Sequence, residues 1–469
     1  MKKFLFTFLL AAAVAGAFTF VLAQEEQGEE KKFVIHGEVR QRAEFLDNFT
    51  DADDDVSDSG LFYPYRARIA AEGHFSKDVV GYAEFQMFGY WGDTTPFQGG
   101  DPYGIIDGAS GGYPSMMPPA IWQNFDPYAG PWFNPNPSNS VQLYQAWVGL
   151  NKIGGSDFSL KVGRQEIVKG SEMLLGDLDF YSGISHDGIV GSIYKDSFGL
   201  DVWWTRPLQG FDFSIQPFDH ESINFYGVWA DFKKIPHEIN VAAYLMYLEY
   251  GLQVPDPARR AFYTIGVRAN KDVELGKNGF AWNAEVAMQS GDFNPDIAGE
   301  LDEKGDISAM AFEGMFGYNL NTSAADHLFQ IKYVMASGNK DPQDADKAEA
   351  FDPMFQDYHM RYGLSDVFTL SDLTALSLGW NMTRSNHILG VDYWMYELSE
   401  DVIDAAGSEQ NDLGSEVDAW YKYQYNPNTQ IMAGLAYFMP GDVIKYMSNP
   451  AGGPTDAGIR LVGNLRLRF

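Results

Sequence analysis

The chain ends in the stretch Ile459-Arg460-Leu461-Val462-Gly463-Asn464-Leu465-Arg466-Leu467-Arg468-Phe469, where apolar and polar residues alternate up to an aromatic last residue. A period of two is typical of a β-strand with one apolar and one polar face. Such a strand needs an apolar medium or a packed core on one side only. A soluble sheet meets this requirement as well, so the composition of the chain has to discriminate between the two.

The composition excludes several classes of protein. The 469 residues include 64 acidic and 33 basic side chains, for a net charge of −31. Without a basic surplus, sequence-independent nucleic-acid binding is excluded as a main activity. The absence of cysteine excludes disulfides and thiol chemistry. A soluble chain of this length would normally form two or three domains, whereas a large outer-membrane β-barrel needs only one.

The amino-terminal residues are typical of a secretory signal. Lys2 and Lys3 precede an apolar run that ends at Ala23, so residues 1–23 are expected to be a signal peptide, with a membrane anchor as the alternative. Residues 24–32 would then form a short polar periplasmic tail. No later run approaches the roughly 20 apolar residues of a spanning helix, which indicates an exported protein without a helical anchor.

In an exported protein, the alternating last strand resembles the final strand of bacterial outer-membrane barrels. Barrel strands have about 9–11 residues, apolar outward and polar inward. We expect an all-β fold, a transmembrane antiparallel barrel of about 18 strands, as a single domain over residues 33–469. The expected strands are 33–46, 61–75, 79–91, 141–151, 157–165, 186–194, 198–206, 222–231, 239–249, 262–270, 279–289, 306–317, 326–336, 371–382, 386–398, 414–425, 429–439 and 458–469.

The connections between these strands alternate in length. Every odd-numbered strand is followed by a long connection, and the turns after even-numbered strands include Ser76–Asp78 and Thr383–Ser385. Because such barrels have short periplasmic turns and longer external loops, both termini are expected in the periplasm. The longest connection, 92–140, is rich in glycine, proline and aromatics. Loops of this length often fold over a site, so it is interpreted as a pore lid, with a passive surface loop as the alternative.

Period-two phasing also predicts which side chains line the pore. A charged side chain that faces lipid costs about 2–4 kcal/mol for Arg or Lys, so charged faces should point inward. Rings of charge in a lumen set solute selectivity; the alternative is that they form salt bridges within the wall. The pore-lining candidates are Glu38, Arg40, Arg42, Arg66, Arg68, Glu72, Glu84, Arg164, Arg268, Lys332, Lys422, Arg466 and Arg468.

The surplus of acidic residues maps to the expected external loops. Asp51, Asp53 and Asp55 have a spacing suited to Ca²⁺ ligands. Val56 and Phe62 stand where a calcium loop has its glycine and its closing glutamate, so these aspartates are only weak metal candidates. The alternative is a solvated surface that faces lipopolysaccharide. No cofactor is expected apart from this possible Ca²⁺.

Three groups of motifs are spread from the fifth to the seventeenth expected strand. They are Gly163-Arg164-Gln165-Glu166 with Leu174-Leu175-Gly176-Asp177 and Asp187-Gly188-Ile189, then Phe351-Asp352-Pro353-Met354-Phe355 with Tyr362-Gly363-Leu364-Ser365-Asp366, and Tyr437-Phe438-Met439-Pro440-Gly441-Asp442. In order and spacing they resemble the bacterial alginate-export family of outer-membrane barrels. The resemblance implies an eighteen-stranded barrel and passage of an anionic polyuronate through a lumen rich in arginine and lysine.

We therefore expect a passive channel in the bacterial outer membrane for a hydrophilic, anionic solute or polysaccharide. A general porin, or a surface receptor that uses the acidic loops, remains an alternative. Enzymatic activity is not expected, because the eight histidines are scattered and no Gly-x-Ser-x-Gly or His-Glu-x-x-His motif occurs. The expected partners are outer-membrane lipid, lipopolysaccharide, the solute, and the barrel-assembly machinery through the strand that ends at Phe469.

Overall fold

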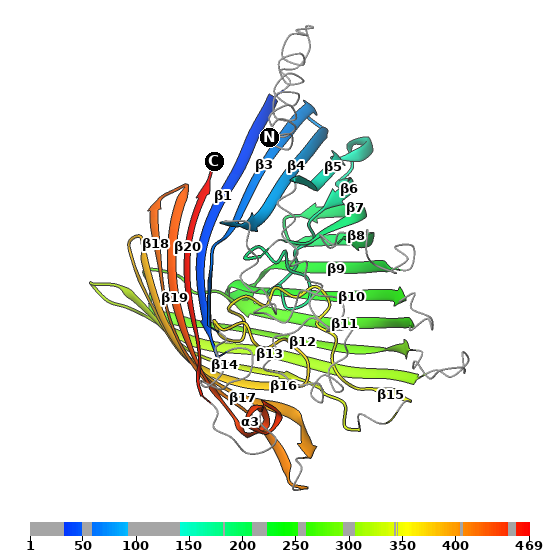
Figure 1. Ribbon diagram of the computed structural model, residues 1–469. Coiled ribbons are helices and arrows are strands. Elements are labelled where there is room, and N and C mark those ends of the chain that lie inside the picture. Colours follow the sequence, from blue (N-terminus) through cyan, green and yellow to red (C-terminus); the bar gives the residue numbers. More distant parts are fainter. Residues whose placement is uncertain are drawn as a thin grey trace, which may run out of the picture.

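The computed structural model describes most of the expected barrel (Figure 1). The expected signal peptide, the tail up to residue 31, the loop 92–140 and the weak metal candidates Asp51, Asp53 and Asp55 lie outside the described residues. The residues described are 32–48, 59–91, 141–181, 183–208, 223–251, 259–293, 305–341, 344, 346–403, 407–448 and 456–469.

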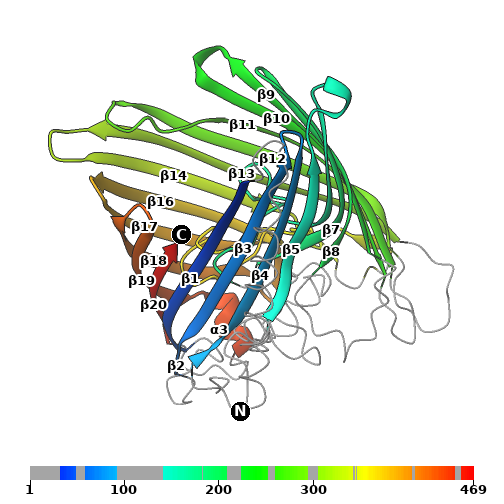
Figure 2. The same ribbon diagram turned by 90° about the horizontal axis from the view of Figure 1, so that it is seen from above.

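Eighteen long antiparallel strands form one closed barrel (Figures 1 and 2), which confirms the expected fold class. Two short strands, β2 (Gly60–Phe62) and β15 (Lys347–Ala348), pair with β1 and β13 at its margin. The long strands are β1 (Lys32–Asp47), β3 (Pro64–Ser76), β4 (Val79–Tyr90), β5 (Val141–Leu150), β6 (Phe158–Gln165), β7 (Ser185–Lys195), β8 (Phe198–Leu208), β9 (Asn224–Ile235), β10 (Ile239–Gly251), β11 (Arg259–Lys271), β12 (Gly279–Phe293), β13 (Gly305–Asn321), β14 (Asp326–Ala336), β16 (Leu373–Arg384), β17 (His387–Ile403), β18 (Glu409–Asn426), β19 (Thr429–Pro440) and β20 (Gly458–Arg468).

Within the residues that the structure describes, helices are confined to short pieces between strands. They are η2 (Ile153–Gly155), η4 (Pro236–Glu238) and α3 (Asp442–Ser448). No helix within the described ranges has the length and apolar character needed to cross a membrane.

The first and last strands close the barrel. β1 and β20 pair from Glu38 opposite Arg468 to Asp47 opposite Ile459. Beyond this ladder, the Gly37 N–H donates to the Phe469 carbonyl at 2.8 Å and the Phe469 N–H donates back at 3.0 Å. A Cβ at position 37 would lie 2.3 Å from the Phe469 ring, so this contact requires glycine. The aromatic terminus is therefore part of the closure.

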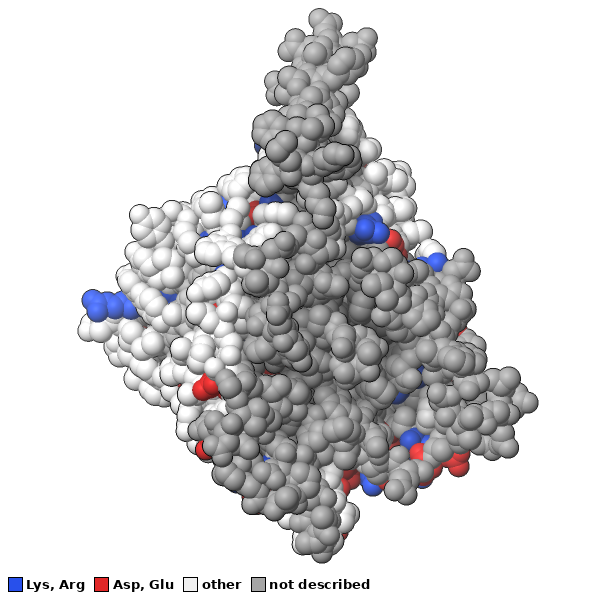
Figure 3. Space-filling model, viewed as in Figure 1, with Lys and Arg blue, Asp and Glu red and all other residues white. Residues whose placement is uncertain are grey.

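The two faces of the wall differ as barrel physics requires. On β1, Val39 is 38% exposed on the outside whereas the neighbouring Arg40 is 2% exposed on the inside. Ile69 and Leu465 lie on the same outer face as Val39 and are also exposed. In the view of Figure 3, the described part of the outer wall is almost free of charge, and charged atoms lie toward its edges.

Two connections fold into the lumen instead of remaining outside. We call residues 166–181, which follow β6, inner segment 1, and residues 349–372, which follow β15, inner segment 2. Figure 2 shows both running inside the ring of strands. Both were expected to be external loops. Their apolar side chains explain the difference, because Leu175 and Phe355 are 1% and 2% exposed here and would meet water outside.

The inner segments contact each other near the middle of the barrel. Leu175 and Phe355 form a parallel bridge. The Gly176 N–H donates to the Phe355 carbonyl at 2.7 Å, and the Phe355 N–H donates to the Leu174 carbonyl at 3.0 Å. A Cβ on Gly176 would lie 2.6 Å from the backbone nitrogen of Asp357. This crossing therefore depends on a residue without a side chain.

Substituting Gly176→Val should separate the inner segments and leave the barrel wall intact, because the added side chain overlaps backbone that cannot rotate away. We expect single-channel recordings to show a higher conductance and more current noise. Gly279→Val, at a position with open space around the Cβ, should retain the wild-type conductance. Unchanged traces for Gly176→Val would show that the crossing does not limit the current.

Candidate functional site

The luminal side of β1, β3 and β20 is organised around one carboxylate, Asp179 of inner segment 1. Arg40 Nη2 lies 2.8 Å and Arg66 Nη2 2.6 Å from its oxygens. Three further guanidinium groups lie within 3.6 Å, on Arg68, Arg466 and Arg468. Five arginines from β1, β3 and β20 therefore share this acid. Three of them, Arg40, Arg66 and Arg468, also pair with Glu38.

Strand register explains why the arginines converge. Arg40 of β1 stands opposite Arg66 of β3 on one side and opposite Arg466 of β20 on the other. Directly opposite residues in antiparallel strands share a face, and like charges there repel. Burial alone would raise the pKa of Asp179, but the neighbouring guanidiniums hold that pKa well below its ordinary value. The ionised carboxylate offsets part of the positive charge of this row of arginines.

A second anchor holds inner segment 2. Arg460 of β20 is fully buried and pairs with Asp366 at 2.7 Å and with Glu44 at 2.9 Å. Asp366 also accepts a hydrogen bond from the Tyr181 hydroxyl at 2.5 Å, which joins the two inner segments. Burial would raise the pKa of Asp366, but His359 and Arg460 lower it below its ordinary value. Both inner segments are thus fixed by ionised aspartates.

The nearby wall strand β18 adds hydrogen bonds to the same stretch of inner segment 2. The Ser365 N–H donates to Glu416 at 2.9 Å and the Leu364 N–H donates to Asp418 at 3.0 Å, both acids being on β18. Inner segment 2 is therefore connected to β18 as well as to β20, two strands that are separated in the wall only by β19.

Most of the charged residues expected in the pore are on the inner face, and most of these form ion pairs or hydrogen bonds with protein groups. Glu38 and Arg66 bond at 3.0 Å, and Arg42 donates to the Phe180 carbonyl at 2.7 Å. Glu72 contacts His74, Glu84 accepts from Gln145, and Arg268 lies 3.5 Å from Glu285. The arginines of β1, β3 and β20 thus fix the inner segments. Solute contact by these side chains stays a prediction.

Arg164 was expected to line the pore, and the structure shows that this prediction is wrong. It stands on the same face of β6 as Val162, which is 41% exposed on the outer wall, and opposite Asp187 of β7. Its guanidinium donates to Asp187 at 2.9 and 3.1 Å. The expectation of an inward position assumed an unpaired charge; pairing with Asp187 removes most of the cost of facing outward.

Three lysines of the inner face differ from the arginines in having no carboxylate partner among the described residues. Lys332 and Lys422 were expected in the pore, and Lys161 was not predicted. Lys161, Lys332 and Lys422 form no ion pair in the described part of the chain, and each ammonium lies over a tryptophan ring, at 4.4 Å from Trp147, 5.3 Å from Trp394 and 4.9 Å from Trp420. A cation over an indole face is stabilised by the ring quadrupole. Lys161 alternates with outward-facing residues in the expected strand 157–165, so phasing of that strand could have identified it.

A cavity of about 370 Å³ lies between the inner segments and the wall strands β12 to β17. Lys332 and Trp394 line it from the wall, and Arg361 lines it from inner segment 2. Arg361 pairs with Glu313 at 2.6 Å. Lys332, in contrast, lines this space without an ion pair to any described residue. The cavity is polar and lies beside the crossing of the inner segments.

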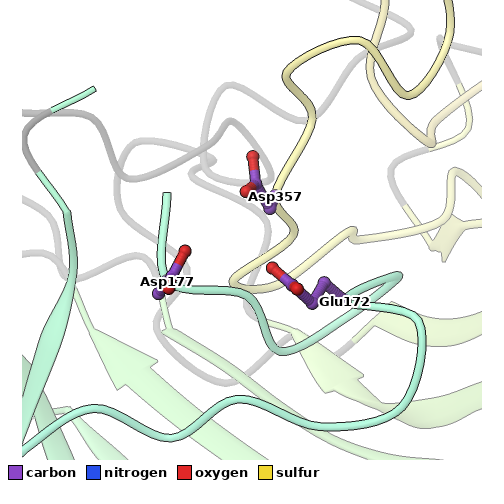
Figure 4. A group of neighbouring side chains, drawn as sticks. All are labelled: Glu172, Asp177 and Asp357. Carbon is purple, nitrogen blue, oxygen red and sulfur yellow. The ribbon is translucent and has the colours of Figure 1, made fainter. Parts of the chain in front are cut away.

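Three carboxylates from the inner segments meet at the edge of this region (Figure 4). Oxygens of Glu172, Asp177 and Asp357 lie within 4.8 Å of one another, and the described residues contain no other such group of three. Acids at this spacing can share a cation or a proton. Burial is the largest cause that raises the pKa of each. Repulsion by Asp177 adds to the rise for Glu172, and repulsion by Asp179 and Glu166 adds to it for Asp177. Burial with repulsion by Asp177 and Glu172 raises the pKa of Asp357 to about 7.

A closed barrel with an apolar outer wall, a charged lumen and two segments folded into it is a porin-like channel of the bacterial outer membrane. The alginate export family model matches residues 132–451, and the chain belongs to this family. A search of curated protein sequences found no match.

Solved structures show the same fold at low sequence identity. OccK9 (OpdG) of Pseudomonas aeruginosa is 12% identical with a TM-score of 0.56, and the match covers 93% of this chain and 99% of that one. OccAB2 of Acinetobacter baumannii is 10% identical with a TM-score of 0.56, covering 93% and 98%. P. aeruginosa OpdK, solved with vanillate, is 11% identical with a TM-score of 0.51, covering 93% and 99%.

Asp179→Asn should make the channel more anion-selective, because five guanidinium groups lose their shared counter-charge. We expect the anion-to-cation permeability ratio, measured from reversal potentials in planar bilayers, to rise by about twofold or more. A buried ion pair that loses one partner costs about 3–5 kcal/mol, so inner segment 1 should also become more susceptible to protease. Asp187→Asn, which removes an aspartate paired with arginine on the outer face, should change neither quantity. A wild-type ratio in Asp179→Asn would contradict the assignment.

The raised pKa of Asp357 predicts a pH-dependent crossing. An acid whose pKa is higher in the folded protein contributes full stability below its ordinary pKa of about 3.9 and loses it as the pH rises through about 7. The inner segments should therefore be held more tightly at about pH 5.5 than at about pH 8.5, with less current noise in single-channel recordings. Asp357→Asn should remove most of this difference in current noise. Equal noise in the wild type at the two pH values would refute the prediction.

Proposed function

We propose that this protein is a passive channel through which a small or polymeric hydrophilic anion diffuses across the outer membrane. The observation that carries the proposal is the division of the luminal cations. The arginines of β1, β3 and β20 are paired with carboxylates of the wall and inner segments, whereas Lys161, Lys332 and Lys422 form no ion pair in the described residues. Unpaired ammonium groups in a lumen are free to attract anions.

The inner segments argue for selectivity over size-limited general diffusion. They lie in the lumen and contact each other through Leu175 and Phe355. Inner segment 2 is bonded to β12, through Gln289 and the Asp352 carbonyl, and to β20, through Arg460 and Asp366. A general porin conducts through a wide aqueous lumen, which these segments occupy in part. Membership of a channel family fits passage of a solute as the activity, and we propose no catalytic role.

The outer surface and the closing strand β20 fit two further partners, the membrane lipid and the barrel-assembly machinery. The exposed apolar face that includes Val39 and Ile69 suits the hydrocarbon of the membrane. We propose that the terminal strand β20, with Phe469 as its last residue, is the element that the barrel-assembly machinery recognises.

Ion selectivity tests the proposed function. In a salt gradient across a planar bilayer, the wild-type channel should prefer anions, and Lys332→Gln with Lys422→Gln should lower the anion-to-cation permeability ratio by about twofold, because two unpaired charges are removed. Lys271→Gln, at the barrel margin beside Glu238, serves as the control and should not change the ratio. A wild-type channel that prefers cations would overturn the proposal.

A further inference from the structure

Three charged residues form a row on the outer face of the wall. Arg164 of β6, Asp187 of β7 and Arg206 of β8 stand directly opposite one another in neighbouring strands, and residues in that relation share a face. Arg164 has the same phase as Val162, and Arg206 has the same phase as Val202; these valines are 41% and 46% exposed on the outer wall. The row therefore lies on the surface that meets the lipid, outside the lumen.

The row lies at one end of the barrel. Arg164 is the last residue but one of β6, and Arg206 is close to the end of β8 at Leu208. Long connections follow both strands at this end, whereas β7 and β8 are joined at the other end by a short turn. Since longer loops are typical of the external side of such barrels, the row is expected at the level of the outer leaflet.

Aromatic side chains on the same face mark the boundary of the hydrocarbon. Trp204 of β8 and Tyr226 of β9 stand directly opposite each other and are 38% and 43% exposed. The Trp204 indole N–H donates at 3.2 Å to Asn224, the first residue of β9, which lies toward the same end of the barrel. Aromatic residues are enriched where hydrocarbon meets headgroups. Arg206 lies two residues beyond Trp204, which places the row at the depth of the headgroups.

The row has a net positive charge, because two arginines flank one aspartate. Asp187 already accepts two hydrogen bonds from the Arg164 guanidinium, and both side chains are partly exposed. Arg206 forms no ion pair within the residues that the structure describes, and its guanidinium carbon lies 5.9 Å from the center of the Trp204 ring. One positive charge at this depth is therefore uncompensated.

Outward positions at the same end of other strands are acidic instead. Asp292 of β12 and Asp306 of β13 are exposed and stand directly opposite each other. Asp47, the last residue of β1, has the same phase as the outward-facing Val39. Because like charges repel, an anionic headgroup is disfavoured beside β1, β12 and β13. The row on β6 to β8 attracts it.

We propose that this row binds a phosphate group of lipid A, the membrane anchor of lipopolysaccharide, with Arg206 and Arg164 pairing with phosphate oxygens. The planar guanidinium group matches phosphate geometry. Lipid A carries its phosphates directly above its acyl chains, and Arg206 and Trp204 follow in the same order along β8. Asp187 orients Arg164 and, through its charge, weakens the attraction. The proposal uses the expected orientation of the barrel and does not depend on the solute.

Native mass spectrometry of the purified protein in detergent micelles, titrated with diphosphoryl lipid A, tests the site. Arg206→Gln should raise the lipid A Kd by about fivefold, as expected for one arginine at an anionic lipid surface. Asp187→Asn should lower the Kd by about threefold, because it removes the acid between the arginines. Arg384→Gln is the matched control, an exposed arginine at the other end of the barrel, and should leave the Kd unchanged. Phosphatidylglycerol should bind at least about fivefold more weakly than lipid A.

Four outcomes would overturn the site: equal affinity for lipid A and phosphatidylglycerol, a wild-type Kd in Arg206→Gln, an unchanged or raised Kd in Asp187→Asn, or the same loss in Arg384→Gln. The tighter binding expected of Asp187→Asn cannot result from misfolding, so it tests the site even if Arg206→Gln fails to fold. Reversal potentials test the proposed function separately, and lipid A binding with the expected pattern supports the site whichever ion the channel prefers.

Discussion

The pairing of Asp179 with five guanidinium groups is the interaction on which the arrangement of the lumen depends. Arg40, Arg66 and Arg466 stand side by side because β3, β1 and β20 are neighbours in a fixed register. A row of like charges in a half-buried wall is unfavourable without a counter-charge, and inner segment 1 supplies it. In turn, the arginines hold inner segment 1 against the wall, in addition to its apolar packing and its hydrogen bonds to inner segment 2.

The sequence predicted the wall well and the contents of the lumen poorly. Alternation located the strands because the lipid imposes a period of two on every one of them; the expected strand 326–336 coincides with β14. It also placed Arg40 and Arg66 on the inner face. Their partner Asp179 lies more than 110 residues away in the chain, and no periodicity links residues at that separation.

The failures have the same physical origin. The inner segments were expected outside because Leu174-Leu175 and Phe355 are apolar groups too short to be read as strands, and only the folded barrel shows what they pack against. Arg164 was expected inside because an isolated charge avoids lipid, but Asp187 opposite it neutralises that charge. Local rules hold where the membrane acts on each residue alone and fail where a distant or cross-strand partner changes the balance.

The arginines of β1 and β20 lie where these two strands close the barrel. Their position links the placement of inner segment 1 to the closure of the barrel. β1 and β20 pair with each other and so close the ring. Their pairing brings Arg466 and Arg468 up to Arg40, and Asp179 supplies a counter-charge to all three. The closed ring and the placement of inner segment 1 therefore stabilise each other.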